Sequence, residues 1–304
     1  MKVLLACDGS VHSRLAEEVF LRTPFAKTAE VAVVAVAPPV PVQSSEWDVS
    51  ALEGVQQVVD EVRQRCEANV AEAKKRLQGR VGSLQGEVHV GEPSAVLLDF
   101  VTAWGADWVV AGSRGESAIA GFLLGSTARR LLSYSGATVL VGRCDAGKTP
   151  QETIDRLADV NKLAVLVAYD GSPGSDQVVA AVSAPNKPYR EVVVACAEPL
   201  AVMPFGMSPV GWPDTVVSLD RERALALVAS AAERCRDLAD TVTTEVRLGR
   251  AANVLNGAAT THHIDLIALG ATCHGFIERF LLGSVSYEVA TTAPCSVLVV
   301  RSMG

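Results

Sequence analysis

Short apolar runs alternate along this chain with longer segments in which apolar residues recur every three or four positions. The runs have the length and composition of buried strands, and the periodic segments have the pattern of amphipathic helices. Strands that alternate with helices predict an α/β fold with a parallel sheet covered on both faces. The predicted strands are 2–7, 30–37, 86–91, 107–112, 137–142, 163–169, 190–197, 243–248, 265–270 and 295–300, and the predicted helices are 12–22, 52–78, 93–104, 123–134, 175–183, 219–240, 250–262 and 281–291.

The pattern occurs twice along the chain, in the same order. Asp8-Gly9-Ser10 reappears as Asp170-Gly171-Ser172, an offset of 162 residues, and Ala137–Val141 reappears as Cys295–Val299, an offset of 158. Landmarks that keep their order with small changes of spacing indicate a tandem duplication of one domain. We therefore predict a first domain at 1–144, a linker at 145–162 and a second domain at 163–304.

The segment after the fourth predicted strand of the first half carries the most chemistry. Gly112 follows apolar residues directly, and Gly115 comes after two more residues. Gly125 comes after nine further residues, beside Ser126 and Thr127 at the start of a helix. Glycines let backbone N–H groups approach an anion, and a helix start adds donors where the helix dipole is positive. The segment therefore fits a phosphate-binding loop, but it also fits a glycine turn followed by a hydroxyl N-cap.

Composition and charge narrow the classes of function. The 304 residues, of which 49 % are apolar and 5 % are aromatic, suffice for about two domains. The net charge is −7, and the Lys and Arg residues are scattered along the chain. We therefore expect neither nucleic acid nor a membrane as a partner. No segment approaches the roughly 18 apolar residues that a membrane span needs. Seven cysteines without regular spacing indicate reduced thiols and a cytoplasmic location.

A strand ending in Asp-Gly-Ser, a loop of the form Gly-x2-Gly-x9-Gly-Ser and a final strand of the type Pro294–Arg301 together resemble the universal stress protein family. The resemblance covers nearly the whole chain twice, as in the tandem members of that family. It implies two repeated Rossmann-like α/β domains, each with a five-stranded parallel sheet of strand order 3-2-1-4-5. It also implies ATP binding where the glycine motif is intact.

The resemblance further implies roles for individual residues. Asp8 would face the adenine–ribose end of the nucleotide, and the backbone of Val36 would contact the adenine. The second half departs from the motif because Cys273 stands where the second glycine belongs, and its Cβ restricts close approach. The implied phosphate-binding residues are Gly112, Gly115, Gly125, Ser126 and Thr127, and the residues implied for the second half are Asp170, Cys196, Gly270, Gly283 and Ser284.

Two other motifs compete with this interpretation. Gly142–Thr149 matches the Walker A pattern, but it falls at the seam between the repeats and needs a helix that starts at its lysine. We interpret it as part of the linker. A zinc site would need about four ligands at fixed spacing, so we expect ordinary polar histidines at a helix end and no metal. The residues that suggest such a site are His262, His263, Cys273 and His274.

We therefore predict a stress-response regulator that binds an adenine nucleotide, either ATP alone or ATP with Mg. The sequence shows no nucleophile elbow, Ser-His-Asp order or paired carboxylates, so we expect no enzyme and at most slow ATP hydrolysis. The alternative is an interaction scaffold of the same fold that binds no nucleotide. The apolar final strands, Thr138–Val141 and Ser296–Val300, predict a pseudo-dimer of the two halves within one chain, and a homodimer is a further option.

Overall fold

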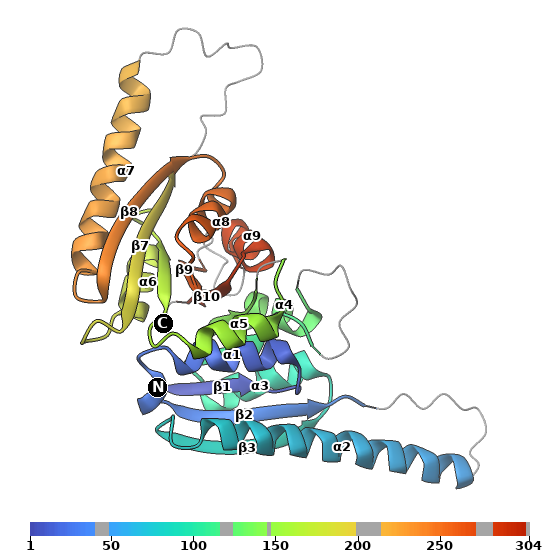
Figure 1. The fold of residues 1–304 in the computed structure, drawn as a ribbon. Helices are drawn as coiled ribbons and strands as arrows, with labels where there is room; N and C mark the ends of the chain where they lie inside the picture. The colour runs from blue at the N-terminus through green and yellow to red at the C-terminus, as the bar shows by residue number, and fades with distance from the viewer. Residues whose placement is uncertain (40–48, 116–123, 145–146, 199–213, 272–281, 302–304) are drawn as a thin grey trace, which may run out of the picture. The chain divides into compact units, whose positions relative to one another are not determined.

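The chain forms two compact units, each with strands and helices in the same order (Figure 1). The first unit comprises residues 1–142 together with 150–154, and the second comprises 143–149 together with 155–302. Residues of the predicted linker therefore belong partly to one unit and partly to the other. The structure is a computed structural model that describes residues 1–39, 49–115, 124–144, 147–198, 214–271 and 282–301.

The first unit contains a parallel sheet in the order β3-β2-β1-β4-β5. Its inner strands are Val-rich and buried, because helices cover both of their faces. In Figure 1, α2 lies alongside β2 and β3 and extends beyond them. The elements are β1 (Lys2–Ala6), α1 (Val11–Leu21), β2 (Glu30–Ala37), α2 (Val49–Leu77), β3 (Ser83–Val90), α3 (Pro93–Trp104), β4 (Trp108–Gly112), α4 (Ser126–Tyr134) and β5 (Thr138–Gly142), with a short 3-10 turn at Ala26–Thr28.

The second unit repeats this topology in the order β8-β7-β6-β9-β10, again with parallel neighbours. Its long helix α7 lies against β7 and β8, as α2 lies against β2 and β3 in the first unit. Both sheets therefore have the predicted order 3-2-1-4-5. The elements are β6 (Ala164–Ala168), α6 (Pro173–Val182), β7 (Tyr189–Glu198), α7 (Asp214–Arg234), β8 (Ala239–Leu248), α8 (Ala251–Thr261), β9 (Leu266–Gly270), α9 (Ser284–Thr292) and β10 (Ser296–Val300).

Some boundaries differ from the predicted ones. The helix predicted to reach residue 240 ends at Arg234, and β8 begins at Ala239 instead of 243. The early start arises because Ala239 pairs with Tyr189 on β7. Likewise, β3 begins at Ser83, three residues before the prediction, because it pairs with the start of β2. Strand pairing is a tertiary contact, so periodicity along the chain does not reveal these ends.

The Walker-like segment lacks the helix start that a phosphate loop needs at its lysine. Its helix, α5 (Pro150–Ala158), begins only after the segment's lysine and threonine. A Cβ on Gly142 would lie 2.5 Å from a backbone nitrogen of α1, so this glycine is explained by helix packing. The next residue, Arg143, donates from its backbone nitrogen to the Ser296 hydroxyl at 3.2 Å. Within the second unit, Arg156 on α5 forms an ion pair with the buried Asp265 at 2.6 Å.

In the part of the chain that the structure describes, no helix is both long enough and apolar enough to cross a membrane. Cys7, Cys196, Cys235 and Cys295 carry buried free thiols. The Pro-rich segments after β2 and β7 lie mostly outside the described residues.

Candidate functional site

A cavity of about 770 Å³ opens at the carboxyl ends of β1, β2 and β4 in the first unit. The strand order reverses between β1 and β4, and open α/β sheets bind ligands at such a switch point. The walls come from these strand ends, from the start of α4 and from one face of α2. Every residue that the sequence predicts for the first half lines this cavity, namely Asp8, Val36, Gly112, Gly115, Gly125, Ser126 and Thr127.

The turn after β1 is built around Asp8. Its Oδ1 accepts a hydrogen bond from the backbone of Ser10 at 3.0 Å, and the Ser10 hydroxyl accepts one from the backbone of Ser13 at 3.1 Å to cap α1. The other carboxylate oxygen faces the glycine loop, by which we mean the segment from Gly112 to Gly125, because a Cβ on Gly115 would lie 2.9 Å from Asp8 Oδ2. The Asp-Gly-Ser turn and the glycine loop, far apart in the sequence, therefore form one wall.

The glycine loop is closed at its base by backbone hydrogen bonds. Gly125 N donates to Ser113 O at 2.7 Å, and Ser113 N donates to Gly142 O at 3.0 Å. The Ser10 hydroxyl also donates to Arg114 O at 3.3 Å. Residues 116–123 lie outside the described residues, but both ends of this loop are fixed beside the cavity.

The start of α4 presents donors to the cavity. Gly125 has an extended backbone as N-cap, so the amides of Ser126 and Thr127 have no partner within the helix. The helix dipole adds partial positive charge at this end. Three arginines also line the cavity, and Asp8 is the one acidic residue among its described lining. These donors and charges favour an anionic ligand. The arginines are Arg65, Arg114 and Arg129.

The glycines of the motif are needed for different physical reasons. A Cβ on Gly112 would lie 2.6 Å from the backbone nitrogen of Ser13, so close packing of β4 against α1 requires this glycine. A Cβ on Gly125 would meet nothing closer than Ser113 O at 3.4 Å, an ordinary contact. Protein packing therefore explains Gly112 but leaves Gly125 unexplained. An added side chain at 125 would point between the loop and the helix start, where a ligand would sit.

We expect Gly112→Ala to lower the free energy of unfolding by about 1–3 kcal/mol, because backbone atoms of α1 must move to admit the methyl group. Urea denaturation of the full chain measures this loss. Gly136→Ala is a suitable control, since a Cβ there has nothing within 4 Å. Equal stability of the two variants would show that α1 yields easily and would contradict this account of Gly112.

Sequence reasoning missed the contribution of α2. Asn69 donates from Nδ2 to the carbonyl of Asp8 at 3.2 Å, and Cys66 lines the cavity one turn away. No motif marks these residues, because their place depends on how α2 packs over the β1 turn. Burial raises the pKa of the Cys7 thiol to about 11, so this lining thiol stays neutral at pH 7 and is a poor nucleophile.

One predicted correspondence is wrong: Cys196 does not take the place of Val36. In the first unit, the backbone amide of Gly91, just after β3, donates to Ala37 O at 3.0 Å. In the second unit, the equivalent amide of Gly249, just after β8, donates to Glu198 O at 2.9 Å. Glu198 therefore matches Ala37, and Ala197 matches Val36. The second half is one residue shorter before this strand, and a run of uniformly apolar residues conceals such a shift.

The other residues predicted in the second half hold positions equivalent to those in the first. Asp170 Oδ1 accepts from the backbone of Ser172 at 2.9 Å, as Asp8 does from Ser10. Gly270 ends β9, and Gly283 is the N-cap of α9 next to Ser284. Cys273 lies outside the described residues.

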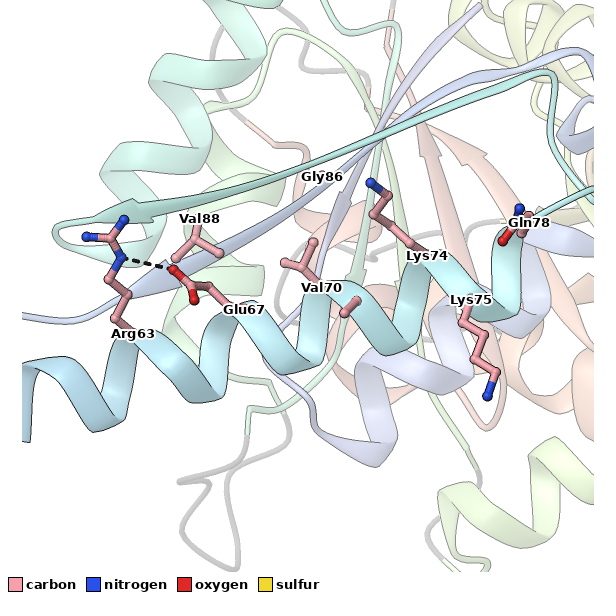
Figure 2. Close-up of a pocket in the computed structure, with 9 residues that line it drawn as sticks. Arg63, Glu67, Val70, Lys74, Lys75, Gln78, Gly86 and Val88 are labelled. Carbon is pink, nitrogen blue, oxygen red and sulfur yellow. Dashed lines mark hydrogen bonds and ion pairs between the residues drawn. The ribbon is translucent and has the colours of Figure 1, made fainter.

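A second, more open depression of about 540 Å³ lies between α2 and β3, away from the predicted site. Figure 2 shows Val70 and Lys74 directed toward the strand beside Gly86, whereas Lys75 points away. Arg63 forms an exposed ion pair with Glu67 at 3.0 Å along α2. Mixed charges and exposure are typical of a solvated helix face, so we assign no ligand to this groove.

His262 follows the end of α8 and lies beside two glutamates. His262 Nε2 lies 3.0 Å from Glu245, and Nδ1 lies 3.4 Å from Glu191. Among the described residues, no group of three or more His, Cys, Asp or Glu side chains is arranged to hold a metal ion. Cys273 and His274 lie outside those residues.

The family model described as the universal stress protein family matches residues 1–143 and 164–301. The chain belongs to the universal stress protein family. The two matches correspond to the two repeats, so this universal stress protein is of the tandem type.

Relatives of this universal stress protein match it over both halves. A universal stress protein of Mycolicibacterium smegmatis is 27 % identical and covers 98 % of this chain and 96 % of its own length. One from Mycobacterium tuberculosis strain H37Rv is 29 % identical over 88 % of this chain and 83 % of its own. The crystal structure of a universal stress protein from Archaeoglobus fulgidus covers 99 % of this chain and 96 % of its own at 19 % identity, with a TM-score of 0.53, a likeness of fold.

Proposed function

We propose that the first half of this universal stress protein binds ATP and acts as a stress-response regulator through that binding. The observation that carries the proposal is the cavity of about 770 Å³ in which the intact glycine motif, the start of α4 and the Asp8 turn meet. Asp8 and Val36 provide the adenine–ribose end, and the glycine loop provides the phosphate end.

The electrostatics of the cavity support a polyphosphate. The amides of Ser126 and Thr127 and the Thr127 side chain lie at the positive end of a helix dipole. Arg114 and Arg129 line the same end of the cavity, and guanidinium groups match phosphate oxygens in geometry as well as charge. ATP with bound Mg fits equally well, the ion being held by phosphate oxygens more than by protein side chains.

The role proposed for ATP is regulatory. Among the described residues, the cavity lining offers one carboxylate, that of Asp8, and the thiols of Cys7 and Cys66, of which Cys7 is neutral at pH 7, and this is a poor set for catalysis. Bound ATP would order the glycine loop and shift an equilibrium between conformations or partners. Slow hydrolysis is the enzymatic alternative. The pairing of the two final strands within one chain and the formation of a homodimer stay predictions.

Equilibrium dialysis of the purified full chain against labelled ATP, with and without Mg²⁺, tests the proposal. We expect saturable binding that excess unlabelled ATP displaces. A phosphate-release assay in the same samples separates binding from hydrolysis. Absence of saturable binding at about 1 mM ATP, which means a binding free energy weaker than about −4.1 kcal/mol, would contradict the proposal and favour the scaffold alternative.

A further inference from the structure

The side chain of Asn69 on α2 lies directly against the turn that follows β1. Its Nδ2 donates to the backbone carbonyl of Asp8 at 3.2 Å. A Cβ added to Gly9 would lie only 2.4 Å from the same nitrogen. On the other side of Asp8, the Cys7 thiol donates to the backbone carbonyl of Asn69 at 3.6 Å. The long helix α2 is therefore joined to the Asp8 turn at two points.

This contact fixes how the Asn69 amide is oriented. A backbone carbonyl accepts hydrogen bonds but cannot donate them, so the amide nitrogen has to face Asp8 and Oδ1 lies on the other side of the group. Asn69 is half-buried and lines the cavity of the first unit. Within the part of the chain that the structure describes, no hydrogen bond reaches Asn69 Oδ1. Asn69 thus brings an uncharged acceptor without a protein partner to the cavity wall.

Asp8 provides a second acceptor beside the first. Its backbone carbonyl is held by Asn69 and its Oδ1 by the backbone nitrogen of Ser10 at 3.0 Å, so the residue is fixed from two directions. The other carboxylate oxygen, Oδ2, lies on the side of Gly115, and Asp8 itself is exposed in the cavity lining. One charged and one neutral acceptor on neighbouring side chains match two adjacent hydroxyl groups, each of which donates one hydrogen bond.

The second unit shows that the turn does not need this amide. There the side chain of Leu227 on α7 takes the place of Asn69, 3.0 Å from a Cβ added to Gly171. The turn nevertheless forms in the same way, because Asp170 Oδ1 still accepts from the backbone of Ser172 at 2.9 Å. An aliphatic side chain therefore satisfies the packing of the long helix on an Asp-Gly turn. Packing explains a side chain of this size at position 69 but leaves its amide unexplained.

We infer that Asn69 determines the sugar specificity of the first unit, its Oδ1 accepting one hydroxyl of a ribose whose neighbouring hydroxyl donates to Asp8 Oδ2. This inference rests on the proposed function, which assigns the ribose to the Asp8 end of the cavity. A site built with one acceptor for each hydroxyl binds a deoxy analogue less tightly, because one acceptor is left without a donor. The first unit therefore selects ribonucleotides over deoxyribonucleotides.

Calorimetric titration of the full chain with ATP, 2′-deoxy-ATP and 3′-deoxy-ATP tests the inference. We expect each deoxy analogue to bind the wild type about tenfold more weakly than ATP does. In Asn69→Leu, the affinity for ATP should fall by a similar factor, and one of the two analogues should bind as tightly as ATP. Leucine is the residue that the second unit carries at this place. Asn69→Ala removes the amide without adding bulk and should give the same result.

The ratio of affinities separates specificity from structural support. If Asn69 only supported the turn, both substitutions would weaken all three nucleotides equally, and unchanged ratios would overturn the inference. A wild type that binds all three equally would do the same and leave the proposed function intact. Gln64→Ala, an exposed change on the same helix outside the described lining, is the control and should alter neither affinity nor ratio. If the wild type binds none of the three, the proposed function fails and the inference falls with it.

Discussion

Gly125→Val is expected to lower the affinity of the first unit for ATP by about 10–100-fold while the protein stays folded. The φ of −68° and ψ of 159° at this N-cap suit valine, and an added Cβ meets only ordinary contacts. The isopropyl group would fill the gap between the loop at 113–115 and the start of α4. Loss of one charge-assisted hydrogen bond, worth about 1.5–3 kcal/mol, accounts for the decrease.

Calorimetric titration with ATP measures the affinity, and thermal unfolding without ligand checks the fold. Gly136→Val is the matched control, because this exposed glycine lies in the turn before β5 and has no atom near an added Cβ. The control should bind ATP as the wild type does. Unchanged ATP affinity in Gly125→Val would place the phosphates elsewhere.

Arg76→Ala is expected to lower the free energy of unfolding by about 3–5 kcal/mol, the cost of leaving a buried charge without its partner. Arg76 on α2 donates from Nε and Nη2 to the two carboxylate oxygens of Glu17 on α1, at 2.8 and 2.9 Å. The Glu17 side chain is 2 % exposed and that of Arg76 30 %. This pair ties α2 to the body of the first unit, close to the turn that Asn69 contacts.

The loss should depend on pH in a defined direction. Burial raises the pKa of Glu17 in the folded chain above its ordinary value of 4.5, although Arg76 opposes this rise. A carboxyl group whose folded pKa is raised contributes its full stabilisation below pH 4.5. This contribution is lost as the pH rises through the pKa of the folded state. Without Arg76 the folded pKa should rise further. The deficit of Arg76→Ala should therefore shrink as the pH is lowered toward 4.5.

Urea denaturation at several pH values measures both effects. Arg63→Ala is the control, because its pair with Glu67 lies on the same helix but both side chains are more than half exposed, and such pairs contribute about 0–0.5 kcal/mol. Glu17→Gln combined with Arg76→Ala should recover part of the stability, since no buried charge remains. A deficit in Arg76→Ala no larger than that of Arg63→Ala would contradict this account.

Much of the fold could be predicted from the sequence. Each strand and helix predicted from periodicity exists, because burial on both sides of a parallel sheet requires continuous apolar runs. The ends of α7 and β8 could not be predicted, because β8 begins where Tyr189 on β7 offers a partner and not where the sequence pattern changes. The misassignment of Cys196 has a similar origin, since only the hydrogen-bond register distinguishes neighbouring apolar residues.

The sequence by itself determined the duplication, the α/β class, the family and the glycine motif, because these depend on the order and spacing of residue types along the chain. Only the tertiary structure decided which residues surround the cavity together. It brought Asn69 to the Asp8 turn, gave Gly112 a packing role and left Gly125 with only ordinary contacts around an added Cβ. It also revealed Leu227 beside Gly171 at the second turn. Contacts between residues distant in sequence depend on how helices pack on the sheet, and no local pattern encodes them.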